Sequence, residues 1–395
     1  MAKGKDSLTR VNKSYESGRS TLRQKVSMPV LIAWFALLAY GALVIWTASL
    51  TIADASFSRQ LIGIALGLVL AFFCWRSDFS GLANLSTVLL VIDILILFSP
   101  YVPGLSYNAK GMTGWIKIPG IGLTFQPVEL AKIITIFFVA SLGAQYNGRI
   151  DTVRDYVKLC AMLAIPFGCA VVAGDLGSGL VVFFSGAIVI MMSGPRKEWV
   201  LCTIAIIIGL VSLMLAADSV LDSALGHDVL LKQYQMNRLL VFLDPESDTS
   251  GAGYNLMQSL IAVGSGGFFG KGIGQASQAG EGFLPEAHTD FVFALLSEEF
   301  GFVGAIVLLA LFALLIISTI RVAHRTDSMF LKLVAVGIVG MWTFQVLEEV
   351  GMCIGLMPIT GIPLPFISFG SSSMLIQCGA VGIVQSIWRH RGKAA

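Results

Sequence analysis

Charged residues are scarce in this chain of 395 residues. Asp, Glu, Lys and Arg together make up 13% of it, and hydrophobic residues make up 56%. A soluble domain carries about 25% charged residues. The mean hydropathy is +0.82, so there are too few polar side chains to cover a water-facing surface. The composition therefore excludes an ordinary soluble protein and predicts an integral membrane protein.

Patterns typical of metal, redox and repeat proteins are also missing. The four histidines are scattered, and no two cysteines show C-x-x-C spacing. All six cysteines lie in apolar stretches, where small packing residues are expected: Cys74, Cys160, Cys169, Cys202, Cys353 and Cys378. No internal repeat is evident, which argues against a transporter built from two inverted halves.

Long apolar runs fill most of the chain. A membrane-spanning helix needs about 20 apolar residues, and without water to satisfy the backbone each span must be helical. We predict an all-α integral membrane protein with about ten spans, near residues 30–50, 59–75, 83–100, 128–145, 159–173, 177–193, 199–217, 291–317, 330–353 and 367–388. Residues 30–390 form one polytopic domain. It is preceded by a basic tail at 1–29, expected to be disordered and not a cleavable signal, and followed by a short end at 391–395.

The basic residues predict the orientation. With the N-terminus inside, 19 of the 26 Lys and Arg residues fall on the inner side, as the positive-inside rule requires. Both termini are then cytoplasmic. Two long loops, about 101–126 and 217–289, face outward, with Lys110 and Asp248 outside. The second loop contains apolar and glycine-rich stretches, so we expect it to fold back onto the membrane surface.

Ionisable residues at membrane depth are candidates for function because they are costly to bury. On the outer half these are Glu129, Lys132, Asp175, Arg238 and Asp290. Glu129 and Lys132 share one helix face; the pair either belongs to the site or only neutralises itself. Asp175 is either functional or the cap of the helix that follows it.

Two outer segments remain to be interpreted. The glycine-rich run from Gly264 to Gly274 has no preceding strand and no G-K-[ST] ending, so we interpret it as a flexible hairpin and not as a nucleotide loop. The string from Phe283 to Phe293 places His288 and Asp290 where the loop enters a helix. Asp290 alone could also be read as the cap of that helix.

A set of motifs resembles the SEDS family, the RodA/FtsW glycosyltransferases of peptidoglycan. These are Gly114-Trp115-Ile116, the run from Gln126 to Lys132, Gly174-Asp175-Leu176-Gly177, Arg238 before Phe242-Leu243-Asp244-Pro245, the run from Gly251 to Tyr254, the run from Leu284 to Phe291, and the run from Gly361 to Ser368. They follow in family order from about residue 30 to 390. The chain departs from the pattern at Phe369-Gly370-Ser371-Ser372, where Tyr-Gly-Gly-Ser is favoured, and at Glu349, where Asn is usual. The run from Gly351 to Pro363 looks more like the elongation branch, RodA, than the division branch, FtsW.

The resemblance implies polymerisation of lipid II with inversion, on the outer face of the bacterial plasma membrane. It places the general base at Asp290 and suggests Lys117, Lys132 and Arg238 for the diphosphate, with Trp115, Glu129, Asp175 and His288 as further substrate contacts. A divalent cation, Mg²⁺ or Mn²⁺, would suit the leaving group, although the sequence shows no cage for one.

Partners and rival functions follow from the same resemblance. It implies a class B penicillin-binding protein as partner, docked near the small residues from Gly370 to Ser373, and no nucleic acid. Two other classes stay open: a lipid II flippase, and a scaffold that only positions a transpeptidase.

Overall fold

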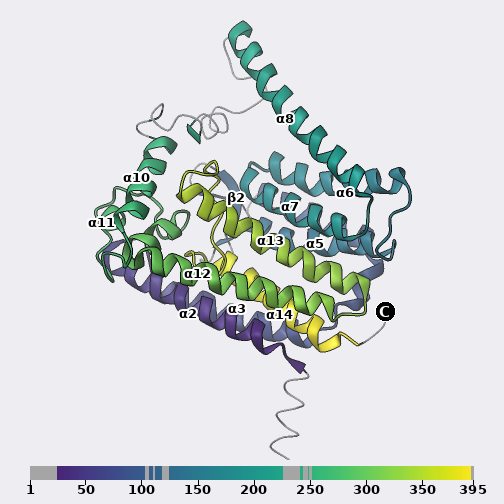
Figure 1. Cartoon of the computed structure of the whole chain (residues 1–395), viewed down its shortest axis with the longest axis horizontal. Coiled ribbons are helices and arrows are strands. Elements are labelled where there is room, and N and C mark those ends of the chain that lie inside the picture. Colours follow the sequence, from purple (N-terminus) through teal and green to yellow (C-terminus); the bar gives the residue numbers. More distant parts are fainter. Residues whose placement is uncertain are drawn as a thin grey trace, which may run out of the picture.

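The structure is a computed structural model, and it describes residues 25–102, 106–109, 112–117, 124–225, 241–242, 248 and 251–392. Most of the basic N-terminal tail, Lys110 and Arg238 lie outside these residues. The described part is a bundle of long helices with smaller elements gathered at one end (Figure 1).

Within the described residues, ten helices coincide with the ten predicted spans. They are α2 (Met28–Thr51), α3 (Phe57–Arg76), α4 (Ser86–Phe98), α5 (Pro127–Ala144), α6 (Val153–Val172), α7 (Leu176–Met192), α8 (Lys197–Leu225), α12 (Val292–His324), α13 (Met329–Cys353) and α14 (Ser371–His390). Six of the helices in the described residues are long and apolar enough to cross a membrane unaided, while α4 and α7 are apolar but shorter. The predicted class, an all-α multi-pass membrane protein, is confirmed.

The two ends of the described chain lie on the same side of the bundle. The Ser27 backbone N–H donates to the Gln385 side chain at 2.8 Å, and Gln385 donates back to the Ser27 carbonyl at 3.0 Å. The Ser386 hydroxyl reaches the carbonyl of Ser77, between α3 and α4, and the Asp327 N–H, between α12 and α13, reaches the carbonyl of Arg391. Connections predicted to be cytoplasmic thus lie together, as the basic residues indicated.

Two helices form the centre of the bundle, and small residues let the others approach closely. Helices α5 and α13 are the most buried spans, whereas α3 and α6 are mostly exposed. On α3, a Cβ added at Gly67 would lie 2.8 Å from the Cys378 sulfur, and one added at Gly382 of α14 would lie 2.4 Å from the Ala71 carbonyl oxygen. Helices α3 and α14 therefore pack through small residues, as membrane helices commonly do.

Helix α8 leans away from the other helices and extends beyond them (Figure 1). It is longer than the predicted span of 199–217. Apolar side chains on several of its faces are exposed, among them Leu201, Ile206, Ile208, Leu210 and Leu213. An apolar helix exposed all round is suited to lipid contact.

The outer loops contain elements that the sequence did not predict. In the first loop, β1 (Ser106–Ala109), β2 (Met112–Lys117) and β3 (Thr124–Phe125) form an antiparallel sheet in the order β1-β2-β3, with Tyr107 opposite Trp115 and Ile116 opposite Phe125. The second loop contains α10 (Ala252–Ser265) and the short α11 (Ser277–Gly280). The strands and α11 are too short to show a pattern, and the apolar stretch that contains α10 was interpreted only as a part of the loop that folds back on the membrane.

Helix α12 is two helices joined at a break. Gly301 has φ +65°, outside helical values, and glycine adopts this conformation without strain. The backbone bonds lost at the break are replaced by the glycine-rich loop: Lys271 and Gly272 N–H donate to the carbonyls of Glu298 and Glu299, and Phe302 and Val303 N–H donate to the carbonyls of Gly267 and Phe268. The expected flexible hairpin is therefore paired along its length with α12. This pairing satisfies polar backbone that lipid could not.

Candidate active site

Asp290 lies at the end of a tight turn directly before α12. The turn is centred on Glu286, which has φ +56°, and the Glu286 carbonyl accepts hydrogen bonds from the N–H groups of Thr289, Asp290 and Phe291. The helix begins at Val292, with Phe291 in the cap position and no side-chain cap bond. The alternative reading of Asp290 as the N-cap residue is therefore wrong, because the turn places Phe291 there. Asp290 is partly exposed.

The segment between α13 and α14, residues 354–370, contacts this turn and will be called the 354–370 loop. The Phe369 N–H donates to the His288 carbonyl at 2.9 Å, and the two rings lie 5.5 Å apart. His288 is buried. Gly361 lies near the carboxylate, since a Cβ added there would lie 3.1 Å from Asp290 Oδ2. Its φ of +74° also favours glycine at this position.

The same loop joins the Asp290 turn to the start of α7. A Cβ added at Gly177 would lie 3.2 Å from the Thr360 carbonyl oxygen, one residue before Gly361. Gly177 is in the first turn of α7, directly after Asp175. The loop therefore lies against both the start of α7, which Asp175 precedes, and Asp290, 115 positions away from Asp175 in the sequence.

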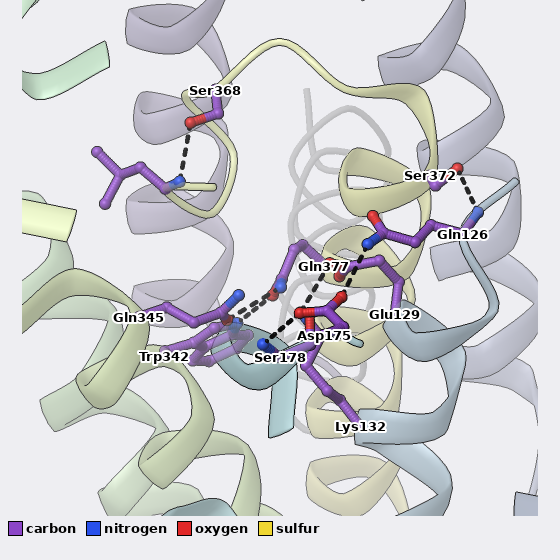
Figure 2. Close-up of polar contacts among 11 residues, drawn as sticks. Gln126, Glu129, Lys132, Asp175, Ser178, Trp342, Gln345, Ser368, Ser372 and Gln377 are labelled. Carbon is purple, nitrogen blue, oxygen red and sulfur yellow. Dashed lines mark hydrogen bonds and ion pairs between the residues drawn. The ribbon is translucent and has the colours of Figure 1, made fainter. Parts of the chain in front are cut away.

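Asp175 caps α7 and also binds α5. Its Oδ1 accepts the Ser178 N–H at 2.8 Å, and its Oδ2 accepts the side-chain amide of Gln126 at 3.1 Å (Figure 2). The capping interpretation is confirmed. A cavity of about 20 Å³, large enough for one water, lies beside Asp175 and is lined also by Gly114 of β2. The unpredicted sheet therefore lines the same cavity as this carboxylate.

Glu129 and Lys132 form a buried ion pair on α5. Lys132 Nζ lies 2.7 Å from Glu129 Oε1, and their side chains are 0% and 1% exposed (Figure 2). The i,i+3 spacing thus places them in contact, as predicted. Because Lys132 is enclosed and paired, it does not face open solvent in this conformation.

Three predicted residues can be placed only in part. Trp115 lies in β2 and is half-buried. Lys117 ends the same strand, but its side chain is outside the described set. Arg238 lies outside the described residues altogether.

A family model described as "Cell cycle protein" and named for FtsW, RodA and SpoVE matches residues 28–393. The chain belongs to this family. It is 36% identical to the peptidoglycan glycosyltransferase MrdB of Escherichia coli (strain K12), over 92% of this chain and 93% of that protein. It is 32% identical to stage V sporulation protein E of Bacillus subtilis, over 94% and 99% respectively. It is 33% identical to a probable peptidoglycan glycosyltransferase FtsW of Coxiella burnetii, over 93% and 98%.

Solved structures agree with the family assignment. A chain from a peptidoglycan synthase complex, described as coordinating polymerization and crosslinking, matches with a TM-score of 0.73 and 28% identity, over 92% of this chain and 98% of that one. The rod shape determining protein RodA of Thermus thermophilus matches with a TM-score of 0.65 and 26% identity, over 92% and 97%. With its apolar helices and this family membership, the chain is a multi-pass protein of the bacterial inner membrane.

Buried amide and carboxyl side chains also form hydrogen bonds inside the bundle. Several of these residues were not among the predicted site residues. The Trp342 indole donates to Gln377 at 2.8 Å, and Gln377 donates to Gln345 at 3.1 Å, linking α13 to α14 (Figure 2). The Gln126 N–H donates to the Ser372 hydroxyl at 3.2 Å. Uncharged polar residues in the apolar runs were the available signal, because in lipid they need partners.

The four glutamates of α12 and α13 have hydrogen-bond partners that could not be predicted from the sequence. Glu298 accepts the Lys271 ammonium, and Glu299 accepts the Gly274 N–H. Glu348 accepts the Thr360 hydroxyl, and Glu349 accepts the Phe293 N–H. Across the part of the chain that the structure describes, no group of three or more His, Cys, Asp or Glu side chains is arranged to hold a metal. The divalent cation therefore stays a prediction.

Proposed function

We propose that this protein polymerises lipid II into glycan strands at the outer face of the plasma membrane, with Asp290 as general base. Family membership and relatives named peptidoglycan glycosyltransferases support the enzyme class. The observation that carries the role of Asp290 is its placement: a partly exposed carboxylate at the outer end of α12, held by its own turn and faced by Gly361.

The proposed reaction is a displacement at the anomeric carbon. A hydroxyl of the acceptor sugar forms the new C–O bond while the bond to the lipid diphosphate breaks, with inversion. Asp290 accepts the hydroxyl proton. A carboxylate can act as a general base when the hydroxyl is within hydrogen-bond reach. A carboxylate fixed by a helix start holds that geometry better than one in a loose loop.

The diphosphate leaving group requires positive charge. Lys117 and Arg238 are the proposed contacts from the outer loops, and Lys132 would join them if the α5 region opens, since it is enclosed beside Glu129. A bound Mg²⁺ or Mn²⁺ would supply further neutralisation. Trp115, Asp175 and His288 are proposed to shape the headgroup site, because β2 and the start of α7 line one cavity and the loop beside the start of α7 also approaches Asp290.

The partner is proposed to be a class B penicillin-binding protein that crosslinks the strands. The similar chain from a complex that combines polymerization with crosslinking supports this. We further propose the elongation-type role, on the run from Gly351 to Pro363. Three relatives are about equally similar to this chain, at 32–36% identity: stage V sporulation protein E, FtsW and MrdB. Overall similarity therefore does not distinguish the branches.

The test is glycan polymer formation from lipid II by purified Asp290→Asn protein. We expect polymerisation to fall by about 10²-fold or more, with the melting temperature unchanged because Asn is isosteric. Asp248→Asn is the matched control: Asp248 also lies in the second outer loop, where its carboxylate binds the Gly251 N–H, and Asn can keep that bond. Near wild-type polymerisation by Asp290→Asn would remove Asp290 as the base. A flippase or a scaffold would form no polymer even as the wild type.

A further inference from the structure

Glu349 is an unusual side chain to find at the centre of this bundle. It is 0% exposed, on the most buried face of α13, one turn from the helix end. Its Oε1 accepts the Phe293 N–H at 3.0 Å and lies 3.7 Å from the Cys353 sulfur. Among the described residues, no group hydrogen-bonds its Oε2. Burying a carboxyl group costs free energy, so we ask what its contact with Phe293 contributes.

Phe293 lies in the first turn of α12, the helix that follows Asp290. The first N–H groups of any helix lack partners within it. In α12, Ala294 and Leu295 N–H reach the Phe291 carbonyl, but Phe291 has no side-chain acceptor to cap the first turn. Glu349 supplies that acceptor from α13. It therefore does for α12 what a capping side chain does in other helices, but across a helix–helix contact.

The neighbouring residue, Glu348, binds the 354–370 loop, which approaches Asp290. Glu348 accepts the hydroxyl of Thr360, next to Gly361, which faces the Asp290 carboxylate. Two successive residues of α13 thus bind two different segments. Glu348 binds the 354–370 loop, and Glu349 binds the start of α12.

We propose that Glu349 is a positioning residue for Asp290: by holding the first turn of α12 through Phe293, it fixes the direction in which Asp290 meets the acceptor sugar. This inference rests on the proposed role of Asp290. The Glu286 turn fixes the chain before Asp290, and the Glu349 contact fixes it three residues later. Without the second contact, the first turn can fray and the carboxylate loses its direction.

Two variants separate the hydrogen bond from the charge. Glu349→Gln keeps an acceptor oxygen, whereas Glu349→Met has similar volume and no equivalent acceptor. We expect Glu349→Gln to polymerise lipid II within about 3-fold of wild type. We expect Glu349→Met to lower kcat by about 10-fold or more with KM for lipid II changed less than about 3-fold, because small misplacement of a catalytic group is costly.

A matched control addresses simple loss of stability. Gln385 is also buried on a central face, and its two bonds to Ser27 lie at the cytoplasmic end, far from Asp290. Gln385→Met removes a buried polar contact of the same kind, and we expect it to lower the melting temperature without lowering kcat.

Backbone amide exchange of the peptide covering residues 286–296 gives a readout that does not need activity. Exchange should accelerate in Glu349→Met and not in Glu349→Gln or Gln385→Met. Wild-type kcat in Glu349→Met, or equal damage from Glu349→Gln, would overturn the proposal. If Asp290→Asn stays active while the exchange pattern holds, the proposed base fails and the helix-fixing contact of Glu349 stands.

Discussion

Removing the Lys132 ammonium tests whether the buried pair on α5 serves chemistry or only burial. Lys132 and Glu129 are 2.7 Å apart and almost fully enclosed. Lys132→Met keeps an unbranched side chain, one heavy atom shorter, but leaves Glu129 as a buried charge without its cation. Breaking a buried pair in this way typically costs about 3–5 kcal/mol, a large share of the roughly 5–15 kcal/mol that stabilises a typical protein.

The assay measures thermal stability and glycan polymer yield on the same purified samples. We expect Lys132→Met to lower the melting temperature clearly and to abolish most polymer formation. The double variant Glu129→Gln with Lys132→Met removes both charges, so the uncompensated carboxylate disappears and most of the stability should return. If Lys132 also acts on the substrate, polymer formation stays lost in the double variant.

Each alternative result has a definite meaning. Recovery of activity together with stability in the double variant would show that the pair only neutralises itself, the alternative that the sequence left open. A wild-type melting temperature for Lys132→Met would refute the reasoning from burial. Wild-type polymer yield from well-folded Lys132→Met protein would exclude Lys132 from the site.

Three further predictions follow from the described residues. In intact cells, an impermeant thiol reagent should label a cysteine at exposed Glu281 and not one at exposed Asp327; the reverse pattern would invert the topology. Gly361→Ala introduces a Cβ about 3.1 Å from Asp290 Oδ2 at φ +74°, so we expect a cost of about 1–2 kcal/mol and a larger loss in polymer yield than in melting temperature; unchanged yield would contradict the close approach. A class B penicillin-binding protein should co-purify with the protein and raise its polymerisation rate, and failure with every such protein of the source cell would count against the partnership.

The helices could be predicted because lipid imposes a simple rule. Apolar runs of sufficient length must be helical, and the basic residues orient them, so ten spans and their sidedness followed from composition alone. The small sheet could not be predicted in this way, since β3 has only two residues and its partners are set by tertiary contacts. The break at Gly301 was hidden because the apolar run continues through it, and hydropathy does not report φ.

The site was predictable only where its residues are neighbours in the sequence. The Glu129–Lys132 pair follows from i,i+3 spacing, and the Asp175 cap follows from a turn before a helix. The contacts of Glu349 with Phe293 and of Gly361 with Asp290 span 56 and 71 positions, and no local pattern encodes them. The unusual carboxylate at Glu349 was visible in the sequence, but its hydrogen-bond partner was not.

The 354–370 loop explains why these distant residues act as one site. It is a non-helical segment between two spans, and such backbone is tolerated at membrane depth only where protein encloses it. Here Ser368 receives the Gln60 amide from α3, Phe369 binds the His288 carbonyl, and Thr360 lies against the start of α7. The hydrogen bonds of Ser368 and Phe369 satisfy backbone groups of the loop, and all three contacts hold it against neighbouring elements. Contacts that satisfy backbone in lipid therefore also hold the surroundings of the proposed base, which explains why a site of this kind would form where the helices are interrupted.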